Sequence, residues 1–193
     1  GTDTITGDKQ NYIFGIAPLS SWPSGVFWQF ALTIPGVEKV AILTENTDYG
    51  IPASQETKDG LATGDVDSVI FSVDIGTQDY AGIVERIKAE SPDMIITLVT
   101  GEAAYNFTQQ AADAGIGPLD LPFVTGQDAL ESGSYWTNVP DGQYAFVQRI
   151  GVPETQFTDK GKAFAAAYKE KTGKSDVESY AMEAYDSIAI LAQ

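Results

Sequence analysis

The apolar residues of the chain fall into short runs that are separated by amphipathic stretches. The runs predict strands over 12–16, 39–43, 68–75, 93–99 and 121–125. A sixth run, 143–150, predicts a less regular extended segment. The stretches between them predict helices over about 22–32, 51–62, 79–91 and 102–115. In 79–91 the apolar residues recur at helical spacing, whereas 93–99 is almost continuously apolar, as in a strand covered on both faces.

Strands that alternate with helices are typical of right-handed βαβ units and of a parallel sheet. The pattern therefore predicts an α/β fold, with a doubly wound and mainly parallel sheet over residues 10–150. Beyond this sheet the alternation stops, and two helices are expected at 159–173 and 178–193 with no strand between them. The second helix has a broad apolar face that is formed by Tyr180, Ala184, Ile188 and Leu191. Because such a face needs a partner, residues 151–193 are predicted to be a distinct helical segment.

Composition excludes several classes of function. The 193 residues include 27 acidic and 11 basic side chains, for a formal net charge of −16. A surface this negative repels phosphate, so we expect neither nucleic acid nor an anionic lipid surface as a partner. The chain has no Cys and no His, which removes thiol nucleophiles, Ser-His-Asp triads and nearly all zinc sites. No phosphate-cradling or dinucleotide-binding loop is present, so no cofactor is expected, and no apolar run is long enough for membrane insertion.

In an open parallel sheet, ligands bind beyond the carboxyl ends of the strands. This chain places hydroxyl, amide and carboxylate groups and one phenol there, but little positive charge. They are Tyr49 after the second run, Thr100, Gly101 and Glu102 after the fourth, and Gln127 and Asp128 after the fifth. Such an edge suits a small polar or zwitterionic ligand better than a phosphate.

Two of these strand exits have both a functional and a purely structural interpretation. Thr100 and Gly101 begin a helix whose free N–H groups can accept a carboxylate or carbonyl oxygen, or they are an N-cap and a tight turn. Gln127 and Asp128 can hold an ammonium or amide nitrogen, or they form a solvated turn before a helix. Sequence alone leaves both alternatives open.

The order of several segments is familiar. "YIFGIAP", "VEKVAILTENTDYG", "KDGL", "QDYAGIVERIKAESPDMIITLVTGEAA", "QQAADAGI" and "ESYAMEAYDSIAILA" follow one another along nearly the whole chain. Together they resemble the type I periplasmic solute-binding proteins, and most of all the leucine/isoleucine/valine-binding group that serves ABC importers. Proteins of that family clasp a ligand between two hinged α/β lobes, like a Venus flytrap.

The resemblance implies how this chain is divided and what it does. Residues 10–150 would be the second lobe, and 151–193 would be helices that return to the first lobe, most of which would precede Gly1. A further piece would follow Gln193. The implied function is binding of a small polar solute outside the cytoplasm, an amino acid or a related amide or organic acid. Its partner would be a membrane permease, and its location periplasmic or extracellular, at or near the cell membrane.

The resemblance also assigns roles to single residues. It places aromatic ligand contacts at Tyr49 and Tyr180, and a further contact at Thr100 or Gly101 with Glu102 beside it. Where family members that hold an α-ammonium carry an acidic residue, this chain has Gln127, with Asp128 next to it. This departure leaves room for amides and small organic acids as well as amino acids.

Two other functions remain compatible with the sequence. The same fold could be the sensor domain of a regulator or receptor. An enzyme on a flavodoxin-like sheet could use Glu102 or Asp128 as a general base, although the absence of His and Cys disfavours catalysis. We therefore expect a binding protein rather than an enzyme.

Overall fold

The structure, a computed structural model, describes residues 15, 19, 21–126, 133–149 and 151–192. Its centre is a sheet of five parallel strands in the order β2-β1-β3-β4-β5. The strands are β1 (Lys39–Glu45), β2 (Asp67–Val73), β3 (Met94–Thr97), β4 (Phe123–Thr125) and β5 (Phe146–Val147). The strand expected at 12–16 lies outside the described residues.

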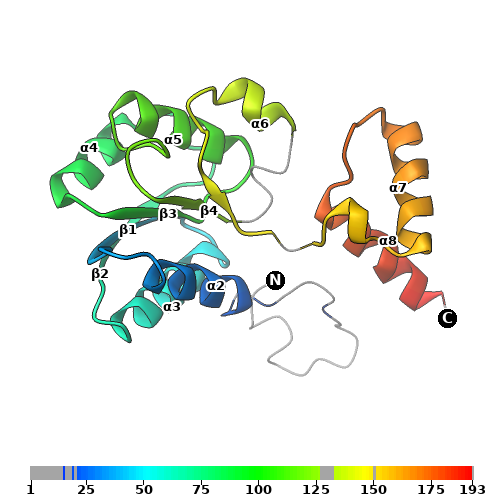
Figure 1. Cartoon of the computed structure of the whole chain (residues 1–193), viewed down its shortest axis with the longest axis horizontal. Helices are drawn as coiled ribbons and strands as arrows, with labels where there is room; N and C mark the ends of the chain where they lie inside the picture. The colour runs from blue at the N-terminus through cyan, green and yellow to red at the C-terminus, as the bar shows by residue number, and fades with distance from the viewer. Residues whose placement is uncertain (1–14, 16–18, 20, 127–132, 150, 193) are drawn as a thin grey trace.

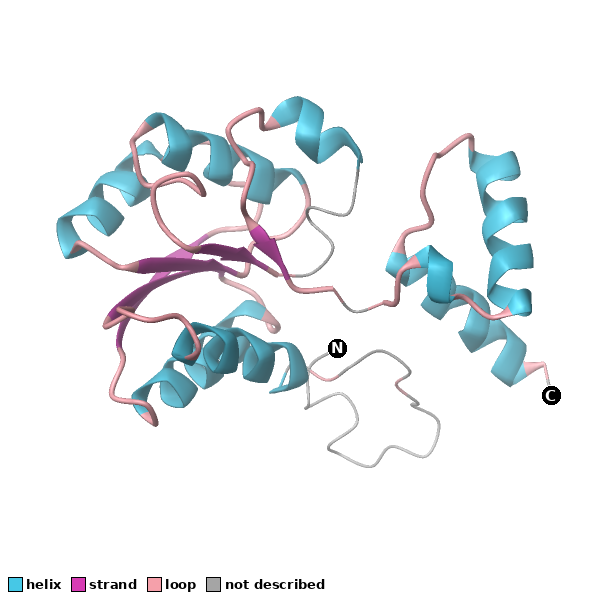
Figure 2. Cartoon of the chain, in the orientation of Figure 1, coloured by secondary structure: helices cyan, strands magenta, loops and turns pink. Residues whose placement is uncertain are grey.

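Helices cover both faces of this sheet (Figures 1 and 2). One face carries α2 (Ser21–Leu32) and α3 (Gly50–Ala62). The other face carries α4 (Ala81–Glu90), α5 (Glu102–Asp113) and α6 (Gly133–Asn138). The prediction of a doubly wound, parallel α/β sheet is therefore confirmed.

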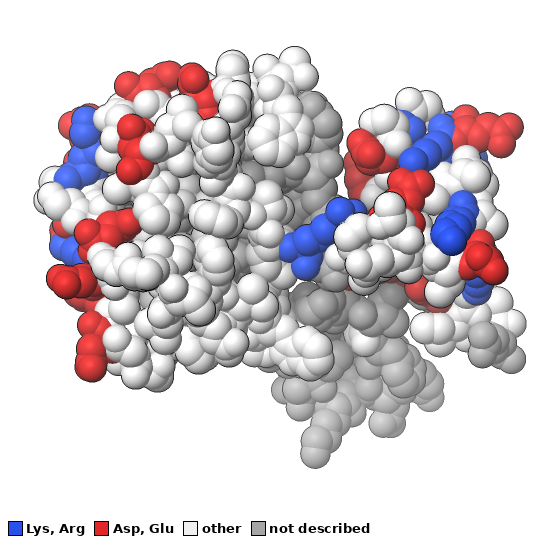
Figure 3. Space-filling view, viewed as in Figure 1, with Lys and Arg blue, Asp and Glu red and all other residues white. Residues whose placement is uncertain are grey.

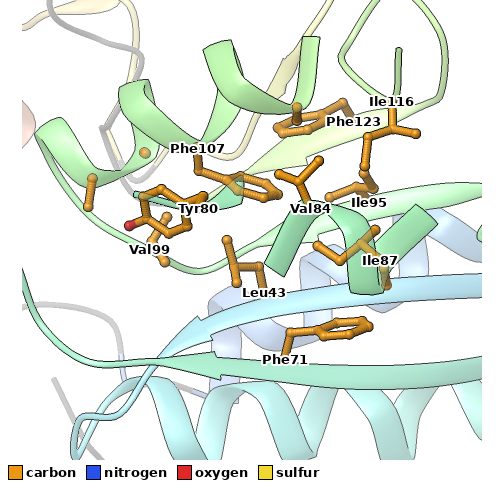
Figure 4. Packing of buried hydrophobic residues seen from close by; sticks show 14 of the residues in the cluster. Leu43, Phe71, Tyr80, Val84, Ile87, Ile95, Val99, Phe107, Ile116 and Phe123 are labelled. Carbon is orange, nitrogen blue, oxygen red and sulfur yellow. The ribbon is translucent and has the colours of Figure 1, made fainter. Parts of the chain in front are cut away.

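Two apolar clusters, one on each face, hold the layers together because successive side chains of a strand point to opposite sides. Ala41 and Leu43 of β1 join the cluster beneath α4 and α5, which also contains Phe107 and Phe123 (Figure 4). Val40 and Ile42 join the cluster beneath α2 and α3. Leu43 and Ile42 are fully buried. Burial of each such side chain contributes roughly 1.5–3 kcal/mol to folding.

The C-terminal part of the chain adds no strand to the sheet in the described residues. After β5 the chain passes through a short 3₁₀ helix, η1 (Glu154–Gln156), into α7 (Asp159–Thr172) and α8 (Ser179–Leu191), which lie beside the sheet-bearing part (Figure 1). Phe164 of α7 packs against Tyr185 of α8, with ring centroids 4.5 Å apart. Among the described residues, every helix is too short or too polar to span a bilayer.

Candidate functional site

The order of the strands predicts a crevice at the carboxyl ends of β1 and β3. The connection through α3 leads from β1 to β2 on one side, and the next, through α4, leads back past β1 to β3 on the other. At such a reversal the two connections diverge and leave an opening at the carboxyl ends of the two neighbouring strands. In the space-filling view, charged side chains of the sheet-bearing part gather mostly at the end away from α7 and α8 (Figure 3). The crevice is the candidate site.

The loop between β1 and α3 is fixed by its own backbone and by one hydroxyl. The Asn46 N–H donates to the Val73 carbonyl at 2.8 Å, which extends the pairing of β1 with β2. The Gly50 N–H donates to Oγ1 of Thr47 at 2.7 Å. Thr47 therefore caps the first turn of α3, and this cap fixes the position of the neighbouring Tyr49.

Tyr49 precedes α3 and packs against the cluster beneath α2 and α3. Its hydroxyl is buried and has no hydrogen-bond partner. Burial raises the pKa of the Tyr49 phenol well above its usual range, and the nearby Tyr180 and Glu56 raise it further. Tyr180 lies on α8 and is 46% exposed. The structure thus brings Tyr49 and Tyr180, two of the predicted contacts, into electrostatic range across 131 positions of sequence (180 − 49).

Thr100 does not cap α5, contrary to the structural interpretation of its position. Its hydroxyl donates instead to Oε2 of Glu45 at 3.2 Å, which joins the exits of β3 and β1. Gly101 is the N-cap, with φ +59° and ψ −138°, a backbone conformation that only glycine adopts readily. No side chain caps α5. Thr100 and Gly101 both follow the carboxyl end of β3, and their contact with a ligand stays a prediction.

Glu102 is the first residue of α5 and is exposed. Its side chain helps to line a depression of about 370 Å³ on the surface of α5. The other lining residues carry mostly amide groups and are Gln78, Tyr105, Asn106, Gln109, Gln110 and Asn138. Among the described interactions, none joins Glu102 to Tyr49 or Thr100. The structure therefore places Glu102 at the edge of the crevice without engaging it there.

The exit of β4 is only partly described, since Gln127 and Asp128 lie outside the described residues. Two residues before them can be placed. Thr125 ends β4, and its Oγ1 is buried without a hydrogen-bond partner. A Cβ on Gly126 would lie 2.7 Å from Cζ of Phe27, so α2 packs directly on this exit.

Three buried hydroxyls without a partner follow the carboxyl ends of three different strands. They belong to Tyr49 after β1, Tyr80 after β2 and Thr125 at the end of β4. A buried polar group that lacks a hydrogen bond costs free energy, so such groups call for an explanation wherever they cluster. The sequence analysis did not place Tyr80 at this edge, because Tyr80 falls in the segment 79–91 that was predicted as an amphipathic helix.

Glu45 lies in the same polar stretch after the second apolar run as Tyr49, but the sequence analysis gave it no role of its own. It ends β1 and is only 7% exposed, although a charged residue at a strand end is usually solvated. The one available signal was its position between a buried strand and the tyrosine loop. Within the described ranges, no three carboxylates gather as they would around a metal ion.

An all-parallel α/β lobe with a polar crevice at its switch point defines a class of ligand-binding folds. The sequence model of a family described as periplasmic binding protein matches residues 1–193. The chain belongs to the periplasmic binding protein family. This match confirms the resemblance that the order of sequence segments indicated.

Solved structures share the fold at low sequence identity. A solute-binding protein of an ABC transporter from Rhodopseudomonas palustris, in complex with 4-hydroxybenzoate, superposes with a TM-score of 0.84 at 23% identity, over 99% of this chain and 52% of that chain. A leucine-binding protein from Thermotoga maritima superposes with a TM-score of 0.74 at 18% identity, over 90% of this chain and 49% of that chain. A fatty acid ABC transporter substrate-binding protein from Thermomonospora curvata superposes with a TM-score of 0.80 at 19% identity, over 94% of this chain and 47% of that chain.

The chain spans about half the length of these proteins. Identities this low establish a common fold and leave the ligand open. Among curated protein sequences, none matches the chain.

Proposed function

We propose that this chain is part of a two-lobed receptor that binds a small polar solute outside the cytoplasm and delivers it to an ABC importer. In this proposal residues 10–150 form one lobe, and 151–193 contribute helices to the other lobe. The receptor works in the periplasm or at the outer surface of the cell membrane, and the membrane permease is its protein partner. Membership of the periplasmic binding protein family supports the binding role, the importer partner and the location outside the cytoplasm.

The observation that carries the proposal is the Tyr49 hydroxyl, which is buried without a hydrogen-bond partner just after β1. Tyr180 of α8 acts electrostatically on this phenol, and in this proposal the ligand therefore lies between the sheet-bearing part and α8. A ligand that contacts both parts binds better when they are close together. It therefore favours the closed arrangement, which is the basis of hinge closure in receptors of this kind.

The side chains at the crevice favour a solute with a small apolar body and a polar end. Tyr49 and Tyr180 offer aromatic surface, and Thr100 and Glu45 offer oxygen atoms. An amino acid, a related amide or an aromatic or aliphatic organic acid fits this combination. The proposed role is binding rather than catalysis, because the absence of His and Cys disfavours acid–base and nucleophilic chemistry and family members are binding proteins.

A binding titration of the full chain with L-leucine and with 4-hydroxybenzoate tests the proposal, with amide NMR resonances as the readout. We expect at least one of these solutes to shift resonances of 45–50 and 100–101. Tyr49→Ala should weaken that binding by about 1–3 kcal/mol, since it removes a packed aromatic contact. Tyr49→Phe keeps the packing and separates the role of the ring from that of the hydroxyl.

Tyr144→Ala is the matched control, because Tyr144 is 74% exposed and follows α6, away from the crevice residues in sequence. Its affinity should equal that of the unchanged chain. Unchanged affinity in Tyr49→Ala would remove Tyr49 from the site. Shifts that fall only outside the crevice would overturn the proposed function.

A further inference from the structure

Glu45 is a buried carboxylate without a cationic partner in the described part of the chain. Its side chain is 7% exposed, and none of the ion pairs between described residues includes it. Burying an ionised carboxylate is costly unless it is hydrogen-bonded or paired. The described structure meets this cost with a single donor, the hydroxyl of Thr100.

That hydrogen bond determines what Thr100 can offer to a ligand. A hydroxyl has one proton to donate, and Thr100 directs its proton to Oε2 of Glu45 at 3.2 Å. Thr100 is an exposed residue, and its hydroxyl oxygen keeps only lone pairs for any further partner. Both side chains at the crevice between β1 and β3 therefore act as hydrogen-bond acceptors.

The negative charge of Glu45 also acts on Tyr80, a residue of the apolar cluster beneath α4 and α5. Tyr80 is fully buried, and its hydroxyl lies at the edge of the apolar cluster, away from Val84, Ile87 and Phe123 (Figure 4). Burial raises the pKa of Tyr80 to about 12, and the negative charge of Glu45 contributes to the rise. The Tyr80 hydroxyl has no hydrogen-bond partner. The switch point thus combines a buried negative charge with a hydroxyl that is not bonded to it.

We propose that Glu45 and Thr100 form an acceptor subsite, which recognises a hydrogen-bond donor of the solute: an ammonium, an amide N–H or a hydroxyl group. This inference rests on the proposed function and specifies the chemistry of the same crevice. A donor group there supplies the partner that the buried carboxylate lacks. A solute that presents a carboxylate at this point meets only negative charge and lone pairs, so the subsite also fixes the orientation of the ligand.

The test compares solutes that differ by one donor group, in titrations of the full chain. One pair is L-leucine and 4-methylpentanoate, which lacks the ammonium group. The other is 4-hydroxybenzoate and benzoate, which lacks the hydroxyl group. A hydrogen bond to a charged acceptor favours the donor-bearing member of a pair by about tenfold in affinity. We expect this preference in the unchanged chain, in at least one pair.

Glu45→Gln removes the charge and should reduce the preference to less than about threefold, whereas Glu45→Asp should retain part of it. Glu85→Gln is the matched control, because Glu85 is an exposed glutamate of α4 with an ion pair to Lys88. It should leave the preference unchanged. The ¹³C resonance of the Glu45 carboxyl gives a second readout that needs no variant, since only the donor-bearing solute should shift it.

The outcomes separate the two proposals. Three results would overturn the acceptor subsite and leave the proposed function standing. They are equal affinity for both solutes in each pair, an undiminished preference for the donor-bearing solute in Glu45→Gln, and the same shift of the Glu45 carboxyl resonance with both solutes of a pair. If no solute binds the crevice at all, the proposed function fails for these solutes and the subsite fails with it.

Discussion

Gly50 shows how closely the chain folds back on itself at the mouth of the crevice. A Cβ at this position would lie 2.2 Å from the carbonyl oxygen of Glu45 and 2.5 Å from Oγ1 of Thr44. Neither atom is at the end of a flexible side chain, because the first is backbone and the second belongs to a buried strand residue. Only glycine allows β1 to turn into α3 within so few residues and still seat Tyr49 against the core.

Gly50→Ala should therefore lower the free energy of unfolding by about 1–3 kcal/mol, the usual cost of overpacking. Gly82→Ala is the matched control, because Gly82 lies in α4 and a Cβ there meets nothing within 4 Å. This control should raise stability by about 0.4–1 kcal/mol, since alanine loses less backbone entropy on folding. Urea unfolding measures both. Equal effects of the two substitutions would contradict the packing described for Gly50.

At the scale of elements, the end of α4 is set by the conformation of a single residue. α4 ends at Ser91, which adopts a left-handed conformation with φ +51° and ψ +56°. This conformation strains any residue with a Cβ, and glycine is the usual residue there. The helix is amphipathic and well packed through Val84 and Ile87, so the rest of α4 compensates for the strain at Ser91.

Ser91→Gly should stabilise the protein by about 1 kcal/mol, because it relieves the left-handed strain. Ala89→Gly, two residues earlier in the helix, should destabilise it by about 0.5–1 kcal/mol, because glycine weakens a helix interior. Thermal unfolding of the two variants beside the unchanged chain shows both shifts. Two shifts in the same direction would mean that the end of α4 is not strained.

Hydrophobic periodicity predicted most of the elements, and its failures have physical causes. α6 was missed because "SGSYWTNVPDG" is rich in residues that favour turns, although Tyr135 is completely buried within it. The last extended segment was predicted over 143–150, but only Phe146 and Val147 pair with β4. An apolar run indicates burial, whereas pairing depends on a neighbouring strand that the run cannot specify.

The candidate site was predictable only in part. Tyr49, Thr100, Gly101 and Glu102 follow from the rule that parallel strands present ligands at their carboxyl ends. Tyr180 came from family resemblance, because no local pattern relates α8 to the loop after β1. The bond between Glu45 and Thr100 could not be predicted, since it depends on two strands that are adjacent in space and separated by 55 residues.

At the scale of the whole molecule, two buried tyrosines should make the free energy of unfolding depend on pH in the alkaline range. Tyr80 and Tyr135 are completely buried, and burial raises the pKa of each to about 12. The Tyr135 hydroxyl also donates to the Gly142 carbonyl at 2.9 Å, which closes the turn after α6. In the unfolded chain a tyrosine loses its proton near pH 10, as an approximate model value. Between about pH 10 and 12 the folded state therefore holds more protons than the unfolded state.

The free energy of unfolding should accordingly be constant with respect to these groups below about pH 10, and should fall as the pH rises toward 12. Tyr135→Phe removes one of the groups and should make this fall less steep, although it lowers stability at neutral pH. Tyr144→Phe, at an exposed position, should leave the slope nearer to that of the unchanged chain. Urea unfolding at several pH values gives the slopes. An equal slope in Tyr135→Phe and the unchanged chain would refute the account.

The position of Glu45 and Thr100 outside the two apolar clusters has an evolutionary consequence. Glu45, Tyr49 and Thr100 lie on or beside loops at one edge, while the layers are held together by side chains from the middle of the strands. Under the proposed function, substitutions of Glu45 and Thr100 can alter the ligand with little effect on the packing, so selection can act on each separately. Frameworks can thus stay superposable at low identity, as they do between this chain and two solved structures that are 18% and 23% identical to it.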